Sequence, residues 1–391
     1  MSPLLRFQSF GKKKALSDGL ADRAEYASQE LGPMDDPAKK PDSETPAAGP
    51  LISSLLSARL SRRQMLKVSL IGAGGLAAAV GGLGQLKQVF AAVPSSLGRW
   101  LPLAPKTAPS PRAGAAMAYD GGRRLTVLFG GFSGAKVDAE TWTWNGLTWT
   151  RHNPPLSPPP RSGASIAYHP RSNAVVLFGG QSASGAFLGD TWMWNGRTWT
   201  AVRGGGPPAR HGACMAFDPA TGSLILVGGF TPANFLNDTW RWDGKSWRAL
   251  APASSPPRVT GASLAYSPII GKLILFGGRR GMGVPESGTT WAWDGTNWSY
   301  VPLSPSPRPR AFASMAAAPG GSILLFGGLS NRSLLSDTWT LTSTWSQDSQ
   351  TPGPPPRAYA PLVSDSSTTN SLLLFGGQSD SDFLGDTWVW V

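Results

Sequence analysis

Short apolar runs alternate with polar, turn-rich segments over most of the chain, and the alternation becomes regular from residue 98 onward. Runs such as LTVLF and AVVLF are bounded by glycine, proline, asparagine and aspartate between residues 98 and 391. Short apolar runs between turn residues are typical of buried β-strands rather than helices. We therefore predict an all-β domain over residues 98–391.

The strand-sized pieces recur as six copies of one unit. Each unit has a Pro-Arg pair, small residues, a turn, an apolar run closing on Gly-Gly, a variable loop and a Thr-Trp segment; all but the last then continue to a further Trp. The second glycine of the doublet occurs every 49 or 50 residues, at Gly131, Gly180, Gly229, Gly278, Gly328 and Gly377. A period near fifty with four strands per unit predicts a propeller blade.

The local chemistry of each unit agrees with a blade. The apolar runs are continuous, as expected where both faces of a sheet are covered. The last two strands are joined through WNGLTW, WNGRTW, WDGKSW or WDGTNW. Asn-Gly and Asp-Gly are strong signals for a two-residue hairpin. The tryptophans, 17 in all, supply apolar area for contacts between blades.

This pattern resembles the kelch repeat, in the bacterial form described as like the central domain of galactose oxidase. Its markers are Gly-Gly, then Asp-Thr-Trp about ten residues later, then a lone Trp, and they cover residues 98–391. The resemblance implies a six-bladed β-propeller with four antiparallel strands per blade. It does not imply one function, because kelch propellers include enzymes, scaffolds and ligand binders.

The sixth unit ends on DTWVWV, residues 386–391, and lacks the strand that carries the last Trp. The segment GRWLPLAPKTAPSPR, residues 98–112, can supply it, because Trp100 precedes Arg112 by 12 residues, as Trp149 precedes Arg161. We predict that the N-terminal strand around Trp100 joins the C-terminal blade. Such closure removes two free sheet edges at once.

The first ninety residues have a different character. Residues 1–60 are polar and rich in Pro, Glu, Lys and Ser, and we expect them to be disordered. Residues 61–92 resemble a twin-arginine export signal: Arg62 and Arg63 stand in SRRQMLK, residues 68–86 carry no charge, and VFA offers a cleavage site at residues 89–91. Export to the periplasm, cell surface or medium is expected. The alternative is a membrane anchor formed by residues 68–86.

The net charge of +12 can indicate an anionic partner. Residues 92–391 carry 23 Lys+Arg against 15 Asp+Glu, and all but four of these cations are arginines. Because the arginines stand at repeat positions, we do not expect nucleic acid to be the partner. The single cysteine, Cys214, excludes an internal disulfide.

One arginine per unit is expected at the start of the first strand. These residues are Arg112, Arg161, Arg210, Arg258, Arg310 and Arg357. One hypothesis is a ring of guanidinium groups at the channel mouth, suited to a carboxylate or sulfate. The alternative is a structural pair with the acid before Thr-Trp, namely Glu140, Asp190, Asp238, Asp337 or Asp386. The fourth unit has Thr289 at the acid's position, so Arg258 is expected to be freer than the others.

Departures from the repeat indicate a candidate site over units four to six. Two positions after the arginine, Phe312 and Tyr359 replace the small residues of the other units. Arg279 and Arg280 follow Gly-Gly in unit four, and Arg332 lies in the next unit's loop. Aromatic rings beside arginines suit an anionic glycan or protein ligand. The proposed ligand-binding set is Arg258, Arg279, Arg280, Arg310, Phe312, Arg332, Arg357 and Tyr359. The alternative is that the two aromatic rings plug the channel.

We expect no cofactor, no metal site and no catalytic residue. The copper radical site of galactose oxidase needs two His and two Tyr, one of them linked to Cys. Here His211 starts the first strand of its unit and His169 ends one, so the two belong to opposite faces, and His152 lies near the outer rim. Two functions remain: an exported binding module for a glycan, cell-wall component or protein, and a metal-independent small-molecule enzyme such as a sugar-acid mutarotase.

Overall fold

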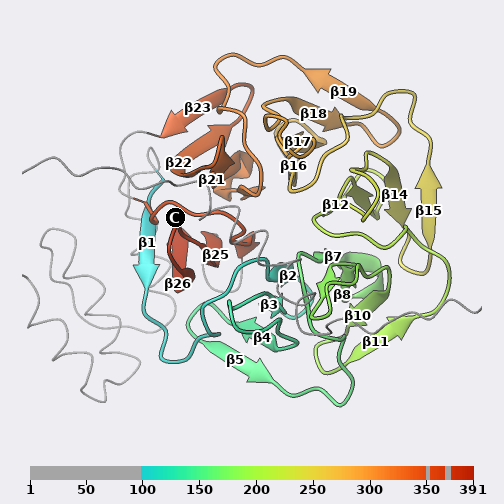
Figure 1. Cartoon of the computed structure of the whole chain (residues 1–391), viewed down its shortest axis with the longest axis vertical. Helices are drawn as coiled ribbons and strands as arrows, with labels where there is room; N and C mark the ends of the chain where they lie inside the picture. The colour runs from blue at the N-terminus through green and yellow to red at the C-terminus, as the bar shows by residue number, and fades with distance from the viewer. Residues whose placement is uncertain (1–97, 349–352, 366–370) are drawn as a thin grey trace, which may run out of the picture. The chain divides into compact units, whose positions relative to one another are not determined.

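A computed structural model describes residues 98–348, 353–365 and 371–391, and within them the chain forms six four-stranded antiparallel sheets around a common axis (Figure 1). The predicted all-β, six-bladed propeller is confirmed. The expected leader, residues 1–60, and the expected signal, residues 61–92, lie outside the described residues. Among the described residues, no helix has the length and apolar character needed to cross a membrane.

Four strands make up each of the first three blades, in order from the axis outward. Blade 1 contains β2 (Ala116–Asp120), β3 (Leu125–Phe129), β4 (Thr141–Trp144) and β5 (Trp149–His152). Blade 2 contains β7 (Ser165–His169), β8 (Ala174–Phe178), β10 (Thr191–Trp194) and β11 (Trp199–Val202). Blade 3 contains β12 (Cys214–Asp218), β13 (Ser223–Val227), β14 (Thr239–Trp242) and β15 (Trp247–Leu250).

The other three blades follow the same order. Blade 4 contains β16 (Ser263–Ser267), β17 (Lys272–Phe276), β18 (Thr290–Trp293) and β19 (Trp298–Val301). Blade 5 contains β20 (Ser314–Ala317), β21 (Ile323–Ser330), β22 (Ser333–Leu341) and β23 (Trp345–Asp348). Blade 6 contains β24 (Leu362–Asp365), β25 (Ser371–Gln378), β26 (Phe383–Trp390) and β1 (Trp100–Leu103). A small sheet pairs β6 (Arg161–Ser162) with β9 (Gln181–Ser182), and two 3-10 turns are η1 (Pro170–Ser172) and η2 (Pro319–Gly321).

The ring is closed by contacts between the innermost strands of neighbouring blades. Each inner strand contacts the next one around the ring, in the order β2, β7, β12, β16, β20 and β24, and β24 in turn contacts β2. The second strand of each blade is sandwiched between blades, so β8 is buried at all five positions. This explains why its sequence is continuously apolar instead of alternating.

The last blade is completed by the N-terminal strand, as predicted. Strand β1 pairs antiparallel with β26, with Trp100 opposite Trp390 and Leu103 opposite Thr387. Figure 1 shows β1 at the outer edge of the ring beside β26. The outermost strand of blade 6 therefore comes from the beginning of the domain, and the ring cannot close until both ends are present.

The repeated Thr-Trp segment joins each blade to the next one. The indole nitrogen of each outer-strand Trp donates a hydrogen bond to the threonine hydroxyl of the preceding blade. The pairs are Trp149–Thr387, Trp199–Thr141, Trp247–Thr191, Trp298–Thr239, Trp345–Thr290 and Trp100–Thr338, all between 2.9 and 3.2 Å. The motif is thus an inter-blade fastening, repeated around the ring.

The glycine doublet also lies at a contact between neighbouring blades. The nitrogen of Gly131 donates to the carbonyl of Arg161 in the next blade at 2.9 Å. A Cβ on Gly130 would collide with that carbonyl oxygen, and Gly130 has a φ of 69°. Only glycine combines this conformation with so close an approach of two backbones.

Candidate functional site

Five of the repeat arginines are buried in ion pairs with an acid of their own blade. Arg310 donates from Nη1 and Nη2 to the two carboxylate oxygens of Asp337, at 2.6 and 2.7 Å. Its Nε donates to the carbonyl of Arg308, and Nη1 also donates to the carbonyl of Gly327. The other pairs are Arg112–Glu140, Arg161–Asp190, Arg210–Asp238 and Arg357–Asp386. All five arginines are at most 1% exposed. In these five blades the repeat arginine therefore forms a structural ion pair with the acid before Thr-Trp and does not contribute to a ring of exposed guanidinium groups.

The acids of these pairs are held in the ionised form. Burial raises the pKa of Asp337, but the hydrogen bonds and charge of Arg310, together with the indole of Trp339, outweigh it, so the pKa of Asp337 lies below its usual value. The same balance lowers the pKa of Asp190, Asp238 and Asp386. A bidentate arginine–carboxylate contact is among the strongest hydrogen-bonded arrangements in proteins.

Blade 4 departs from this arrangement. The expected place of Arg258 at the start of the first strand is wrong, but Arg258 is more exposed than the other repeat arginines, as expected, and its part in ligand binding stays a prediction. Val259, not Arg258, occupies the buried position: its nitrogen donates to the carbonyl of Leu236, as Arg210 does to Leu188. Val259 is 2% exposed whereas Arg258 is exposed. Thr289 replaces the acid, and its hydroxyl oxygen accepts a hydrogen bond from the indole nitrogen of Trp291 at 3.2 Å. Blade 4 has therefore lost both members of the buried pair.

Six residues, one per blade, form a closed backbone ring around the axis. We call it the axial ring. Each nitrogen donates to the carbonyl of the corresponding residue in the preceding blade at 2.7–3.0 Å, through Gly114, Gly163, Gly212, Gly261, Phe312 and Tyr359. All six have a left-handed φ between 56° and 65°. Four glycines therefore satisfy a backbone requirement. In blade 4 the residue two positions after Arg258 is Thr260, but the ring position is held by Gly261, by the same one-residue shift that places Val259.

Phe312 and Tyr359 break the symmetry of the axial ring. Their side chains stack with ring centroids 4.2 Å apart and an interplanar angle of 25°. A Cβ on Gly261 would collide with the ring of Phe312. The aromatic pair therefore extends from blades 5 and 6 over the edge of blade 4, and both side chains remain partly exposed.

One arginine of blade 4 adjoins this aromatic pair. The guanidinium carbon of Arg279 lies 5.6 Å from the centroid of Phe312, within the range of a cation–π contact. Arg279 also pairs with Glu286 at 3.6 Å, and Glu286 accepts the backbone nitrogen of Asn331 at 3.2 Å. Glu286 thus ties the blade 4 loop to the blade 5 loop that carries Arg332.

The remaining candidates differ in exposure. Arg280 and Arg332 are exposed, and Arg280 donates from Nε to the carbonyl of Pro285 at 3.2 Å. Arg310 and Arg357 lie in the buried pairs. We call Arg279, Arg280, Phe312, Arg332 and Tyr359 the mouth site. Sequence reasoning missed Glu286, although its loop was marked out by length: Gly278 and Trp291 are 13 positions apart, against 11 or 12 in the other units.

The opposite half of the axial ring has polar neighbours. Ser162, His211 and Thr260 immediately precede ring glycines, and all three are at most 6% exposed. A Cβ on Gly163 would collide with the imidazole of His211. Hydroxyl and imidazole groups are therefore buried beside the ring in blades 2 to 4, whereas partly exposed aromatic and cationic groups lie over blades 4 to 6.

The histidines are distributed over separate parts of the fold. His169 ends β7 and its Nε2 lies 3.2 Å from the carbonyl oxygen of Gly222, His152 ends the outer strand β5, and His211 precedes β12. Burial lowers the pKa of His152 and of His169, and burial raises the pKa of the Cys214 thiol to about 12. In the described ranges, no group of three or more His, Cys, Asp or Glu side chains could hold a metal ion.

Comparison of the sequence with protein-family models and with curated proteins finds no match. The architecture therefore classifies the chain: it is an all-β, six-bladed propeller closed by its first and last strands.

Proposed function

We propose that this chain is an exported, non-catalytic binding propeller of the kelch type. Its mouth site recognises an anionic ligand, which is a glycan, a cell-wall component or a protein. The observation that carries the proposal is the stacked pair of Phe312 and Tyr359, with the guanidinium of Arg279 5.6 Å from the centroid of Phe312. The two aromatic residues occupy axial-ring positions, which are glycine in the other four blades.

The chemistry of the mouth site favours an anion with a flat or apolar face. Partly exposed aromatic rings offer apolar contact area to a sugar ring or side chain. The side chain of Arg279 is 22% exposed and its contact with Glu286 is long, at 3.6 Å, so it retains donors for a carboxylate or sulfate. Arg280 and Arg332 add exposed positive charge. Arg310 and Arg357 contribute indirectly, because their buried pairs fix the strands that present Phe312 and Tyr359.

Titration calorimetry with the full-length protein tests this function. We expect an oligogalacturonate to bind and the uncharged oligosaccharide of the same length to bind at least tenfold more weakly. Changing Arg279 and Arg280 to Ala should weaken binding at least tenfold, whereas Arg248→Ala, an exposed arginine on β15, should not change it. Equal binding by the double variant, or no binding of any anionic glycan or acidic peptide, contradicts the proposal. Conversion of a sugar acid observed by NMR would favour the enzyme instead.

We propose further that Arg62 and Arg63 direct export of the folded domain. The pairing of Trp100 with Trp390 supports this route, because a ring closed by β1 and β26 is completed only after its last blade has been synthesised. In a bacterial host, Arg62→Lys with Arg63→Lys should leave the full chain in the cytoplasm, while Lys87→Gln should not. Export that is unaffected by the arginine pair contradicts this route. The mass of the exported chain distinguishes cleavage near Ala91 from anchoring by residues 68–86.

A further inference from the structure

A second departure from sixfold repetition lies at the outer rim between blades 2 and 3. The linker that follows β11, residues 203–209, has seven residues, whereas the corresponding linkers 104–111, 153–160, 251–258 and 302–309 have eight. The shorter linker contains Gly204, Gly205 and Gly206, and all three are exposed. It therefore has neither the length nor the side chains that cover the rim elsewhere.

The consequence is visible at Trp247, the outer-strand tryptophan of blade 3. The five equivalent residues are almost completely buried: Trp100 is 4% exposed, and Trp149, Trp199, Trp298 and Trp345 are 0–1% exposed. Trp247 remains partly exposed. Other linkers are hydrogen-bonded to the strand or hairpin of the next blade, for example Thr107 to Trp149 at 2.6 Å and Ala253 to Asn297 at 2.7 Å. The partial exposure of the Trp247 indole is thus a local property of this rim.

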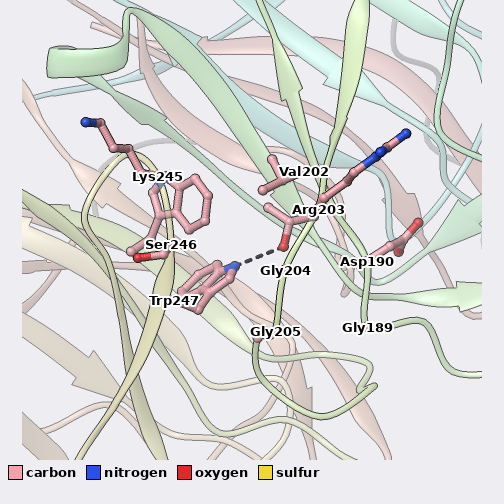
Figure 2. A pocket seen from close by; sticks show the side chains of 12 residues that line it. Gly189, Asp190, Val202, Arg203, Gly204, Gly205, Lys245, Ser246 and Trp247 are labelled. Atoms are coloured by element: carbon pink, nitrogen blue, oxygen red, sulfur yellow. Dashed lines mark hydrogen bonds between the residues drawn. The ribbon is translucent and has the colours of Figure 1, made fainter.

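A hollow of about 90 Å³ lies beside this indole. We call it the rim hollow. Figure 2 shows Trp247 with Gly205 next to it, Lys245 and Ser246 on one side, and Arg203 and Asp190 on the other. The hydrogen bond from the Trp247 indole to Thr191 and the edge contact of its ring with Phe178 at 5.4 Å fix the indole in place. The aromatic face is therefore preorganised.

The charges around the rim hollow favour an anion. Lys245 and Arg203 are exposed, and neither forms an ion pair within the part of the chain that the structure describes. The nearby carboxylate of Asp190 is already engaged by two donors of Arg161 and by the indole of Trp192. Among the charged residues that line the hollow, those without an ion-pair partner are the cations Lys245 and Arg203, so the lining favours a carboxylate or sulfate.

We propose that the rim hollow is a second binding site, specific for a single carboxylated sugar ring. The apolar face of a pyranose packs on the Trp247 indole, and its carboxylate contacts Lys245, while Arg203 adds positive charge on the other side of the hollow. The volume of about 90 Å³ is well below that of sites for drug-sized molecules, about 300 Å³ or more, so the site takes one ring and not a chain of them. This site lies at the outer rim, whereas the mouth site lies at the axis, and it goes beyond the proposed function.

The test is a titration of full-length protein labelled with ¹⁵N-tryptophan, carried out in the Arg279→Ala, Arg280→Ala background so that the mouth site does not contribute. The Trp247 indole resonance is assigned by its loss in Trp247→Phe. We expect D-glucuronate to shift this resonance saturably and D-glucose to bind at least fivefold more weakly. The Trp298 indole, which is buried at the equivalent position, serves as the internal control.

Two variants keep the proposal falsifiable. Gly205→Leu places a side chain where a Cβ meets nothing within 4 Å, so the fold should be unchanged while the hollow is filled and the shift is lost. Lys245→Gln should weaken glucuronate binding at least threefold. The proposal is overturned if glucuronate leaves the Trp247 resonance unmoved, if glucose binds equally well, or if the shift persists in Gly205→Leu. None of these results bears on the mouth site.

Discussion

The indole nitrogen of Trp100 donates a 2.9 Å hydrogen bond to Oγ1 of Thr338, although 238 residues separate them in the chain. Trp100 belongs to blade 6 and Thr338 to blade 5. The equivalent Trp–Thr hydrogen bond joins each of the five remaining pairs of neighbouring blades. The last interface is therefore built like the internal ones, with its tryptophan supplied from the other end of the domain.

Thr338→Val should destabilise the protein by about 1–3 kcal/mol, because it leaves the buried Trp100 N–H without an acceptor. Urea unfolding of the full-length protein measures the loss. Thr141→Val, which removes the acceptor of Trp199 inside the ring, should cost a similar amount. Thr340→Val should cost little, because the hydroxyl of Thr340 bonds to Ser346 in contact with solvent. If Thr338→Val had the stability of the wild type while Thr141→Val was destabilised, β1 would not be docked against blade 5 in solution.

Arg310→Val alone should cost about 3 kcal/mol, because it leaves the carboxylate of Asp337, whose side chain is only 18% exposed, without its arginine. Combining it with Asp337→Thr should recover at least half of that loss, since blade 4 already folds with Val259 and Thr289 at these positions. A double-mutant cycle in urea measures the coupling. Additive losses from the two changes would mean that the buried pair is not a self-contained unit.

Acid should remove the contribution of the buried pairs. The folded pKa of Asp337 is lowered, so its stabilisation is present above the unfolded value of about 3.9 and is lost as the pH falls through the folded value. The difference in unfolding free energy between the wild type and Asp337→Asn should therefore be constant near neutral pH and shrink below about pH 4.

Comparing the two proteins cancels the contribution of the histidines. Burial lowers the pKa of His152 and His169, so their protonation destabilises the fold as the pH falls below about 6.5. This effect is common to both proteins. If the difference between the wild type and Asp337→Asn instead grew toward low pH, the carboxylate of Asp337 would not be stabilised in its ionised form.

Phe312→Gly and Phe312→Ala should differ in stability although both remove the stack with Tyr359. Phe312 has a φ of 56°, and for a residue other than glycine the left-handed conformation costs about 1–2 kcal/mol. The glycine variant should therefore be more stable than the alanine variant by about 1 kcal/mol. Both should lose ligand affinity at the mouth site. Retained affinity would mean that the aromatic ring only fills the channel.

The number of blades and the closure of the ring followed from the sequence alone. Period and local chemistry carry this information: Gly-Gly, Asp-Gly and outer-strand Trp recur at fixed spacing, and the missing strand of unit six has its counterpart around Trp100. These features act through backbone conformation and contacts between adjacent blades, so they must recur in every unit. Phe312 and Tyr359 each stand two positions after the repeat arginine, so the sequence also placed them at equivalent positions of their blades.

The register of blade 4 was decided only by the folded structure. Arg258 matches the repeat by residue type, yet Gly261 must hold the left-handed position in the axial ring, and this shifts Val259 into the buried site. The residue type favoured one alignment and the backbone requirement selected another.

The sequence by itself determined six blades, their strands and the closure by Trp100, because these depend on local pattern repeated six times. Only the tertiary structure decided which arginines are buried in ion pairs, how Glu286 joins the loops beside Phe312, and where Trp247 is left uncovered. Each of these depends on contacts between residues in different strands, loops or blades, and on the presence or absence of one residue in a loop. A repeat period does not contain that information.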